Sequence, residues 1–405
     1  MNATKHEVLF GVDVLLADVP EKLKKARVGL LTNDAATTAA RPHPYAVSRL
    51  AIHDSEINLV ALFSPEHGIG AAEADGATVG SATDGLTGLP IHSLYGKHFA
   101  PTDTMLKEID VLMIDVPDIG ARFYTYIWTM SHILEKCAKA KKSIYVLDRP
   151  NPIGCDLRLA EGPILDETTF NSLVGRWDIP VRHSLTMGEL ANYWNEQKKI
   201  EADLNVVAMR HYNRSMDWQD TGLSFVPTSP AMNSAEEGLI YPGTTLFEGM
   251  NISEARGTSF PFRAIGAPWI REHELADKFN SLELPGVYAR PATYIPADSW
   301  YKGETCRGVM LHVADKSTFR PVATGLWLSY LIWRDYDGDV AWATYPTANN
   351  YTGADHFDRL IGREDIRKVI EGRPSEAEMR KHVVKWTEIG NWTDRVSGCL
   401  LYNLA

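Results

Sequence analysis

Cysteine is scarce in this chain, and the few cysteines that occur lie far apart. The 405 residues include four of them, Cys137, Cys155, Cys306 and Cys399, and no two form a CxxC pair. A structural zinc site or a thioredoxin-type redox motif is therefore not expected. Scattered thiols of this kind are typical of a protein from a reducing compartment.

Positive charge and long apolar runs are also lacking. Lysine and arginine total 41 against 52 aspartates and glutamates, which gives a formal net charge of −11. A nucleic-acid partner would need a basic face, so we expect none. No stretch approaches the roughly 20 apolar residues that a membrane-spanning helix requires, so we expect no membrane span.

The first residues, MNATKHEVLFGVDVLL, do not have the pattern of a secretion signal. They lack a basic region followed by a long apolar core, so as they stand they are not a signal peptide. We expect a cytoplasmic protein, unless a leader has been removed, in which case the protein would be periplasmic or secreted.

Several common catalytic and cofactor motifs are missing. The chain contains no GxxxxGK[ST], HExxH or GxSxG sequence, which removes the P-loop, zincin and serine-hydrolase interpretations. Residues 68–73 begin like a GxGxxG dinucleotide fingerprint, but Glu73 replaces the third glycine. We therefore predict that the protein uses no cofactor.

The first half of the chain alternates strand-like and helix-like segments. Short apolar runs predict strands at 28–32, 59–63, 91–95, 111–116, 143–147 and 205–209. Apolar residues recur at three- and four-residue steps from 123 to 137, which predicts a helix, and a second helix is predicted at 187–197. Strands that alternate with helices imply parallel βαβ units, so we predict an α/β fold with a doubly wound, mostly parallel sheet.

The second half has a different pattern. It predicts strands at 287–294 and 308–313 and helices at 322–334, 366–371 and 375–389. Residues 224–268 are rich in proline, glycine and serine, which predicts a long ordered loop. The length of the chain predicts two domains. We place them at 1–234 and 235–405, the second being a smaller α+β domain.

The clearest chemical signal is the segment LVALFSPEHG at 59–68. It places Glu66 and His67 side by side just beyond the carboxyl end of a predicted buried strand. In open α/β sheets, ligands bind at this edge. A carboxylate beside an imidazole is suited to acid–base chemistry.

Two more polar loops leave the carboxyl ends of predicted strands, DVPDIGARFYTY at 115–126 and LDRPNPIG at 147–154. The three loops converge at one edge of a parallel sheet, so we expect them to form one pocket. Its polar side chains would be Glu66, His67, Asp115, Asp118, Arg122, Tyr124, Asp148, Arg149 and Asn151. The alternative for Asp148 and Arg149 is a structural ion pair.

A fourth polar segment lies within 239–270. Between 251 and 258 it carries Glu254 and Arg256 with little apolar content, so a ligand or a neighbouring domain should be needed to order it. Phe260 and Trp269 are candidates for a stacking platform of the kind that sugar sites use. The alternative is a connecting loop that satisfies its own hydrogen bonds.

A metal site is a further alternative for the residues near the first loop. Its ligands would be Glu66, His67, His92 and Asp115. Adjacent residues rarely ligate one ion together, so we predict no metal.

Several longer segments resemble the NamZ-type exo-acting β-N-acetylmuramidases, a family of glycoside hydrolases. The likeness runs in the same order from Phe10 to Tyr402 and includes FSPEHGI, IDVLMIDVPDIGARFYTYIWTM, VLDRPNPIG and GLIYPGTTLFEGMNISEARGTSFPFRAIGAPWI. The resemblance implies a Rossmann-like amino-terminal domain, a smaller carboxyl-terminal domain and an active site in the cleft between them. It also implies release of β-linked N-acetylmuramic acid from the non-reducing end of peptidoglycan fragments.

The resemblance assigns a role to the PEHG motif. The proposed catalytic glutamate of the family maps onto Glu66, which we expect to be the general acid, with His67 as its support. Beyond PEHG the family usually carries an arginine and then AGE, whereas this chain has Gly70 and Asp75-Gly76-Ala77 at those places. Residues 69–80 are therefore where the specificity is expected to depart from that of the family.

Hydrolysis of a glycoside commonly needs a second carboxylate, for which Asp115, Asp118 and Glu254 are candidates. A 2-acetamido sugar can instead supply its own nucleophile, so retaining, inverting and substrate-assisted mechanisms all stay open.

The lactyl group of a muramic acid carries a carboxylate and demands a cation, for which we choose Arg122 and Arg256. We expect Tyr124 and Asn151 to contact substrate as well. The alternatives to a glycosidase are a metal-dependent hydrolase or esterase on the same loops, and a non-catalytic glycan-binding protein of the cell wall.

Overall fold

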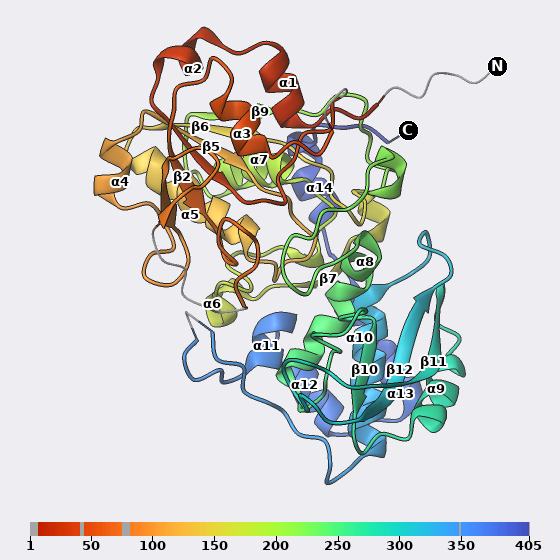
Figure 1. Cartoon of the computed structure of the whole chain (residues 1–405). Coiled ribbons are helices and arrows are strands. Elements are labelled where there is room, and N and C mark those ends of the chain that lie inside the picture. The colour runs from red at the N-terminus through yellow and green to blue at the C-terminus, as the bar shows by residue number, and fades with distance from the viewer. Residues whose placement is uncertain (1–6, 41–43, 75–81, 348–349, 405) are drawn as a thin grey trace, which may run out of the picture.

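The computed structural model describes residues 7–40, 44–74, 82–347 and 350–404. Two parts lie one above the other in Figure 1. The upper one is built on a seven-stranded sheet and is called the large-sheet part below; the lower one, called the small-sheet part, is built on a three-stranded sheet.

The seven strands lie in the order β3–β4–β2–β1–β5–β6–β9, and all neighbours are parallel except β3 and β4. Their bounds are β1 (Val28–Thr32), β2 (Leu59–Ser64), β3 (Ala82–Thr83), β4 (Pro90–Ser93), β5 (Val111–Asp115), β6 (Ser143–Leu147) and β9 (Leu204–Val207). Strands β1, β5 and β6 are buried along their whole length, as expected of a sheet covered on both faces. The six strands predicted in this half are confirmed to within two residues at each end.

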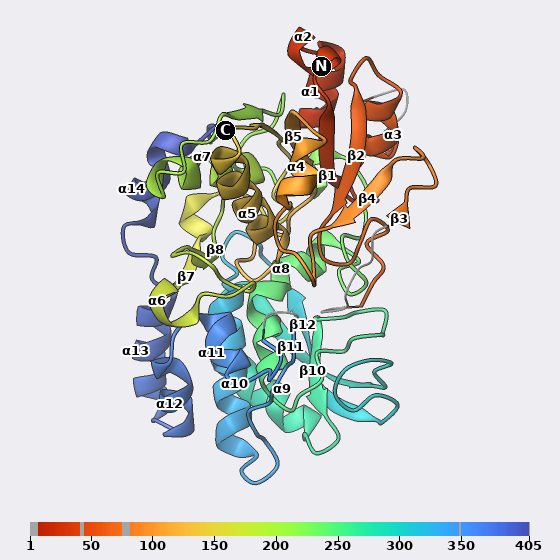
Figure 2. The same ribbon diagram turned by 90° about the vertical axis from the view of Figure 1, so that its left-hand side faces the viewer.

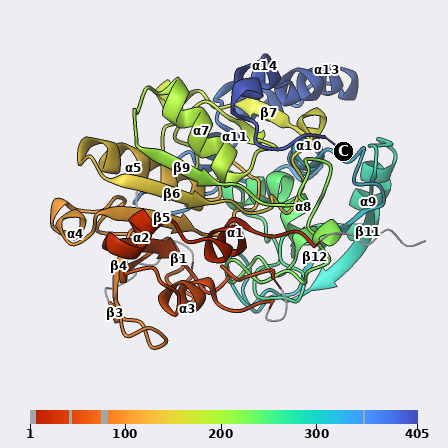
Figure 3. The same ribbon diagram turned by 90° about the horizontal axis from the view of Figure 1, so that it is seen from above.

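Helices cover both faces of this sheet (Figure 3). On one face lie α4 (Asp103–Lys107), α5 (Tyr126–Lys139) and α7 (Met187–Gln197), and on the other α1 (Gly11–Ala17), α2 (Glu21–Lys25) and α3 (Ser48–His53). Successive residues of β5 alternate between the two apolar cores, Met113 in one and Ile114 in the other. The predicted α/β fold with a doubly wound, mostly parallel sheet is therefore confirmed.

The remaining elements of the large-sheet part are short. Strands β7 (Glu161–Ile164) and β8 (Pro180–Arg182) form an antiparallel ribbon, and α6 (Glu167–Phe170) follows β7. Single 3-10 turns occur at η1 (Leu157–Leu159) and η2 (Gln219–Thr221).

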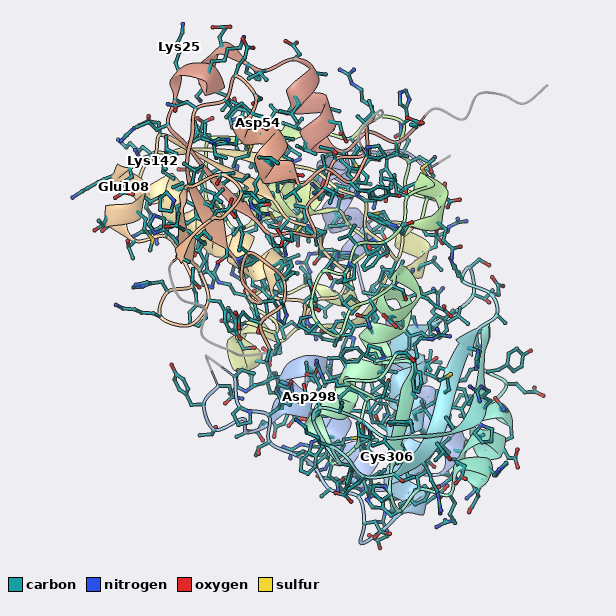
Figure 4. All side chains as sticks on the ribbon, in the orientation of Figure 1. Lys25, Asp54, Glu108, Lys142, Asp298 and Cys306 are labelled. Carbon is teal, nitrogen blue, oxygen red and sulfur yellow. The ribbon has the colours of Figure 1, made fainter. Side chains whose placement is uncertain are left out.

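The small-sheet part places an antiparallel sheet against helices (Figure 2). Its strands lie in the order β10 (Ala264–Ala267), β12 (Cys306–Val313) and β11 (Val287–Tyr294). Its helices are α8 (Ala235–Thr244), α9 (Glu272–Asn280), α10 (Pro321–Asp335), α11 (His356–Ile361), α12 (Asp365–Glu371) and α13 (Glu376–Thr387). Cys306, labelled in Figure 4, begins β12, and all four cysteines are buried. Among the helices described, none has both the length and the apolar character that crossing a membrane requires.

Helix α8 corrects the prediction of an uninterrupted loop at 224–268. The Ser234 hydroxyl caps the helix by accepting a hydrogen bond from the backbone N–H of Glu237. All residues from Glu237 to Thr244 are buried, so packing outweighs the poor helical propensity of the proline and glycines in this stretch. A Cβ at Gly243 would lie 2.0 Å from the Pro321 carbonyl oxygen, so only glycine allows α8 to cross α10 this closely.

The last described residues leave the small-sheet part and pack on the large-sheet part. Helix α14 (Trp392–Val396) lies near α7 in Figures 1 and 2, and the 3-10 turn η4 (Ser397–Cys399) follows it. Nε1 of Trp392 donates to the His183 carbonyl oxygen at 3.0 Å. The chain therefore passes between the two parts twice, near 235 and near 390. The domain boundary near 235 stays a prediction.

Candidate active site

Strand β2 runs into a tight turn that carries Glu66 and His67. His67 has a φ of 67°, in the left-handed region that non-glycine residues rarely adopt, and Gly68 follows with a φ of 73°. Nδ1 of His67 donates a hydrogen bond to the Glu73 carbonyl oxygen at 2.7 Å. In a neutral ring this leaves Nε2 as an acceptor. The two side chains are only 7% (Glu66) and 5% (His67) exposed, so both are held in place.

The Glu66 carboxylate is oriented by Thr125. Oγ1 of Thr125 donates to Oε2 of Glu66 at 2.6 Å. Thr125 is the N-cap of α5, yet its side chain makes no capping hydrogen bond, and the hydroxyl serves Glu66 instead. Sequence reasoning named Tyr124 and missed Thr125, although a threonine just before a predicted helix was an available signal.

Glu66 and His67 line a cavity that both parts of the molecule enclose. The wall from the large-sheet part and the loop after it includes Tyr95, Phe123, Tyr124, Thr125, Leu173, Val174, Ser229, Ala231 and Met232. The wall from the small-sheet part consists of Tyr241, Glu248, Arg256, Phe262, Tyr345, Thr347 and His356. Of the predicted site residues, Glu66, His67, Tyr124 and Arg256 are thus brought together.

Glu248 is the second carboxylate of this cavity. It lies in the 3-10 turn η3 (Thr245–Gly249), directly after α8. Nη2 of Arg256 donates to its Oε1 at 2.6 Å, and Nε2 of His356 lies 3.1 Å from its Oε2. The ring of Tyr345 stacks on His356 with centroids 4.7 Å apart. Sequence reasoning missed all three of Glu248, Tyr345 and His356, and only the acid in GTTLFEGM gave a local signal.

Arg256 connects Glu248 to Glu254, whose Oε1 accepts from Nε of Arg256 at 2.6 Å. Glu254 is fully buried and does not line the cavity. Burial raises the pKa of Glu254 to about 7, against the opposing effect of Arg256. Its position makes Glu254 a support for Arg256 and not a second acid that touches the substrate.

We expect Glu254 to make the protein less stable as the pH rises. Its pKa is about 7 in the folded chain against an ordinary 4.5, so between these values the folded state binds the extra proton. The resulting stability is complete below pH 4.5 and is lost as the pH rises through 7. In urea unfolding from pH 5 to pH 8, the wild type should lose about 2–3 kcal/mol more than Glu254→Gln. Equal slopes of the free energy of unfolding against pH in the wild type and Glu254→Gln would contradict this expectation. Glu283→Gln, at an exposed position, is the control.

Asp115 and the 147–154 loop lie away from the cavity. Asp115 forms a bidentate ion pair with Arg149, with distances of 2.6 and 2.9 Å. Asp148 instead accepts from the hydroxyls of Thr186 and Tyr402, each at 2.7 Å, and burial raises its pKa to about 6. Arg149 therefore does form a structural ion pair, but its partner is Asp115 and not Asp148.

Asp118 and Asn151 likewise make hydrogen bonds away from the cavity. Oδ2 of Asp118 accepts from the Gly120 N–H at 2.8 Å. Asn151 donates to the Leu185 carbonyl oxygen at 3.0 Å and accepts from the Ile153 N–H at 3.1 Å. Neither residue lines the cavity, so neither is placed to contact a ligand there.

Arg122 is also outside the cavity, and its predicted contact with a substrate carboxylate is wrong for this structure. The side chain is fully buried. Its guanidinium donates to the backbone carbonyl oxygens of Pro163, Ile179 and Leu360 at 2.7, 3.0 and 2.7 Å. Arg122 therefore ties the β7–β8 ribbon to α11.

The predicted stacking platform is replaced by other rings. Trp269 donates from Nε1 to the Tyr301 hydroxyl at 2.9 Å, and Phe260 packs edge-on against Tyr294. Neither Trp269 nor Phe260 lines the cavity, whose aromatic residues are Tyr95, Phe123, Tyr124, Tyr241, Phe262 and Tyr345.

The four candidate ligands of the alternative metal site do not all meet in the described structure. Within the described ranges, no three His, Cys, Asp or Glu side chains are grouped so that they could hold a metal ion. His92 packs on Phe63 and does not line the cavity, and Asp115 is paired with Arg149. Residues 75–80, which hold most of the expected departures from the family, lie outside the described residues.

The cavity lies at the carboxyl edge of a parallel sheet, has aromatic walls and, among the described residues, takes one carboxylate from each part, which is compatible with a glycoside hydrolase site. Comparison with known families identifies which type. The family described as exo-beta-N-acetylmuramidase NamZ matches with its N-terminal unit over residues 28–236 and with its C-terminal unit over 239–402. The chain belongs to this family of glycosidases.

Individual relatives span nearly the whole chain. The peptidoglycan beta-N-acetylmuramidase NamZ of Bacillus subtilis (strain 168) is 43% identical over 373 residues, which cover 92% of this chain and 86% of the relative. Two DUF1343 family proteins from Bacteroides fragilis NCTC 9343 have crystal structures that are similar. One is 31% identical with a TM-score of 0.84, covering 98% of this chain and 99% of the other. The second is 26% identical with a TM-score of 0.70, covering 99% and 100%.

Proposed function

We propose that the protein is an exo-acting glycoside hydrolase that releases β-linked N-acetylmuramic acid from the non-reducing end of peptidoglycan fragments. The observation that carries this proposal is the cavity where Glu66, held by Thr125, and Glu248, held by Arg256, come from the two parts of the chain. The 43% identity to the Bacillus subtilis enzyme supports the same activity.

Glu66 acts as the general acid. Oε2 accepts a hydrogen bond from the Thr125 hydroxyl, which fixes the direction of the carboxyl group. As general acid, Glu66 gives its proton to the glycosidic oxygen as the bond to the anomeric carbon breaks. His67, fixed through Nδ1, holds the turn that carries Glu66.

Glu248 acts as the second carboxylate. Arg256 and His356 each contact one of its oxygens, and the two contacts fix the direction of the carboxylate. In an inverting reaction it would activate water, and in a substrate-assisted reaction it would orient the acetamide N–H.

Arg256 is the proposed partner of the lactyl carboxylate. Among the residues that the structure describes, Arg256 is the arginine that lines the cavity. Burial raises the pKa of its partner Glu254 to about 7, so near neutral pH Glu254 offsets the charge of the arginine less than an ordinary carboxylate would. We expect Arg256→Gln to lower the kcat/KM ratio of N-acetylmuramic acid to N-acetylglucosamine β-glycosides about 10- to 100-fold. Arg122→Lys is the matched control because Arg122 lies outside the cavity. An unchanged ratio in Arg256→Gln would exclude this role.

The function itself is tested by product analysis. A defined glycan with N-acetylmuramic acid at its non-reducing end should yield that sugar as a monosaccharide, identified by mass spectrometry. We expect the rate to be unchanged by EDTA, because the cavity offers no cluster of metal ligands within the described chain. Loss of activity in EDTA would support a metal-dependent hydrolase, and binding without release would support a glycan-binding protein.

A further inference from the structure

A second cavity lies apart from the active site and shares no lining residue with it. Its volume is about 300 Å³, which is within the size range of small-molecule sites. Its apolar wall includes Pro152, Ile153, Leu159, Trp218 and Leu239. Nothing in the proposed reaction uses this space.

Arg182, the last residue of β8, reaches this cavity from a buried position. The residue is 1% exposed, and its Nη2 donates to the Ile153 carbonyl oxygen at 2.6 Å. Its Nε and Nη1 have no acceptor among the residues that the structure describes. Glu161, its neighbour across the β7–β8 ribbon, accepts from the backbone N–H groups that begin α10. A buried guanidinium with so little compensation is costly unless an anion joins it.

Two more donors along the same wall also lack acceptors. They are Nε of Arg214, which is 2% exposed, and Nε1 of Trp218. The carboxylates of this wall, in contrast, have cations: Asp156 pairs with Arg158, Asp217 with Lys316, and Glu236 with Arg263. Within the described chain, the unsatisfied buried atoms of this cavity are therefore all N–H donors, which need oxygen acceptors.

We propose that this cavity is a second ligand site, which binds the oxyanion of a small molecule, a carboxylate or a phosphate. Arg182 and the indole N–H of Trp218 donate to the oxyanion, and the apolar portion of the ligand packs on Ile153 and Leu239. The N–H groups of Arg182 that lack acceptors suit either anion, because both anions present oxygen acceptors and carry negative charge.

The site also contacts both parts of the molecule. Lys316, from the small-sheet part, pairs with Asp217 of the large-sheet part at 2.7 Å on its rim. Helix α8 gives Leu239 to this cavity and Tyr241 to the active site. Two residues apart on a helix is a turn of about 200°, so the two cavities lie on different faces of α8. An occupant here would stabilise the arrangement of the two parts.

Calorimetric titration of the full chain with inorganic phosphate and with N-acetyl-D-alanine, at constant ionic strength, tests the site. We expect saturable binding of at least one. Arg182→Gln should weaken it about 10-fold or more, and Trp218→Phe, which keeps an aromatic ring but removes the indole N–H, about 3- to 10-fold. Arg256→Gln, in the active site, should leave it unchanged. Trp218→Phe keeps the test valid if Arg182→Gln does not fold.

The two titrants separate the sources of the anion. Tighter binding of phosphate assigns the site to phosphorylated ligands, and tighter binding of N-acetyl-D-alanine assigns it to carboxylates. No saturable binding of either at millimolar concentrations overturns the proposal. Binding that Arg182→Gln and Trp218→Phe both leave unchanged overturns it as well.

Discussion

Replacement of Glu66 by glutamine is expected to lower kcat about 10²- to 10⁴-fold on a chromogenic N-acetylmuramic acid β-glycoside, because the general acid is lost. The amide keeps the volume of the side chain and an oxygen that can accept the Thr125 hydroxyl. The free energy of unfolding should therefore change by less than about 1 kcal/mol. The loss would then belong to the chemical step and not to the fold.

Thr125 provides the matched control for this experiment. Thr125→Ser keeps the hydroxyl that bonds to Glu66 and should keep most of the activity. Thr125→Val removes the hydroxyl and should lower kcat about 10-fold, since one neutral hydrogen bond is lost. If Glu66→Gln retains more than about a tenth of the wild-type kcat, Glu66 is not the general acid.

Glu248→Gln is expected to have the next largest effect, a fall in kcat of about 10²- to 10³-fold. The reason is positional, because Glu248 is, among the described residues, the other carboxylate on the cavity wall and is oriented by both Arg256 and His356. The measurement is kcat and KM on the same chromogenic glycoside. KM should change less than kcat if Glu248 acts mainly in the transition state.

Glu254→Gln tests whether the loss in Glu248→Gln comes from Glu248 itself or from disruption of the contacts among Glu248, Arg256 and Glu254. Glu254 contacts the same arginine but does not line the cavity. Its substitution should lower kcat by less than about 10-fold, since it acts only through the position of Arg256. Equal losses in Glu248→Gln and Glu254→Gln would mean that the cluster orients Arg256 and that Glu248 has no separate catalytic part.

The anomer first formed by the wild type, observed by NMR, then distinguishes inversion from retention.

The sheet was predictable because its strands are buried on both faces and read as apolar runs. The edge where the site lies was predictable for the same reason, since polar loops follow three of those runs. The sequence did not distinguish the loop residues that reach the cavity from those that hold the loops. Asp115 and Glu66 both lie at the ends of buried strands. Asp115 forms an ion pair with Arg149, whereas Glu66 accepts a hydrogen bond from Thr125 and faces the cavity.

The cavity wall from the small-sheet part was harder to predict from the sequence than the wall from the large-sheet part. Glu248 follows helix α8, which is hard to predict from helix propensity because it contains proline and glycine. Burial against α10 stabilises this helix. Tyr345 comes from a connection without periodic pattern, and His356 begins the short helix α11, about 100 residues further along the chain. Their meeting with Glu248 depends on tertiary packing, for which the local sequence carries no signal.

The return of the chain near 390 constrains how the molecule can open for a substrate. Two covalent crossings, near 235 and near 390, join the parts, so the small-sheet part cannot move away from the large-sheet part without bending both connections. The second crossing is anchored deep in the large-sheet part, where Trp392 packs edge-on against Tyr193 and the Tyr402 hydroxyl reaches Asp148. The small-sheet part is in this sense an insertion held at both ends. The two connections therefore limit how the small-sheet part can move to admit a substrate.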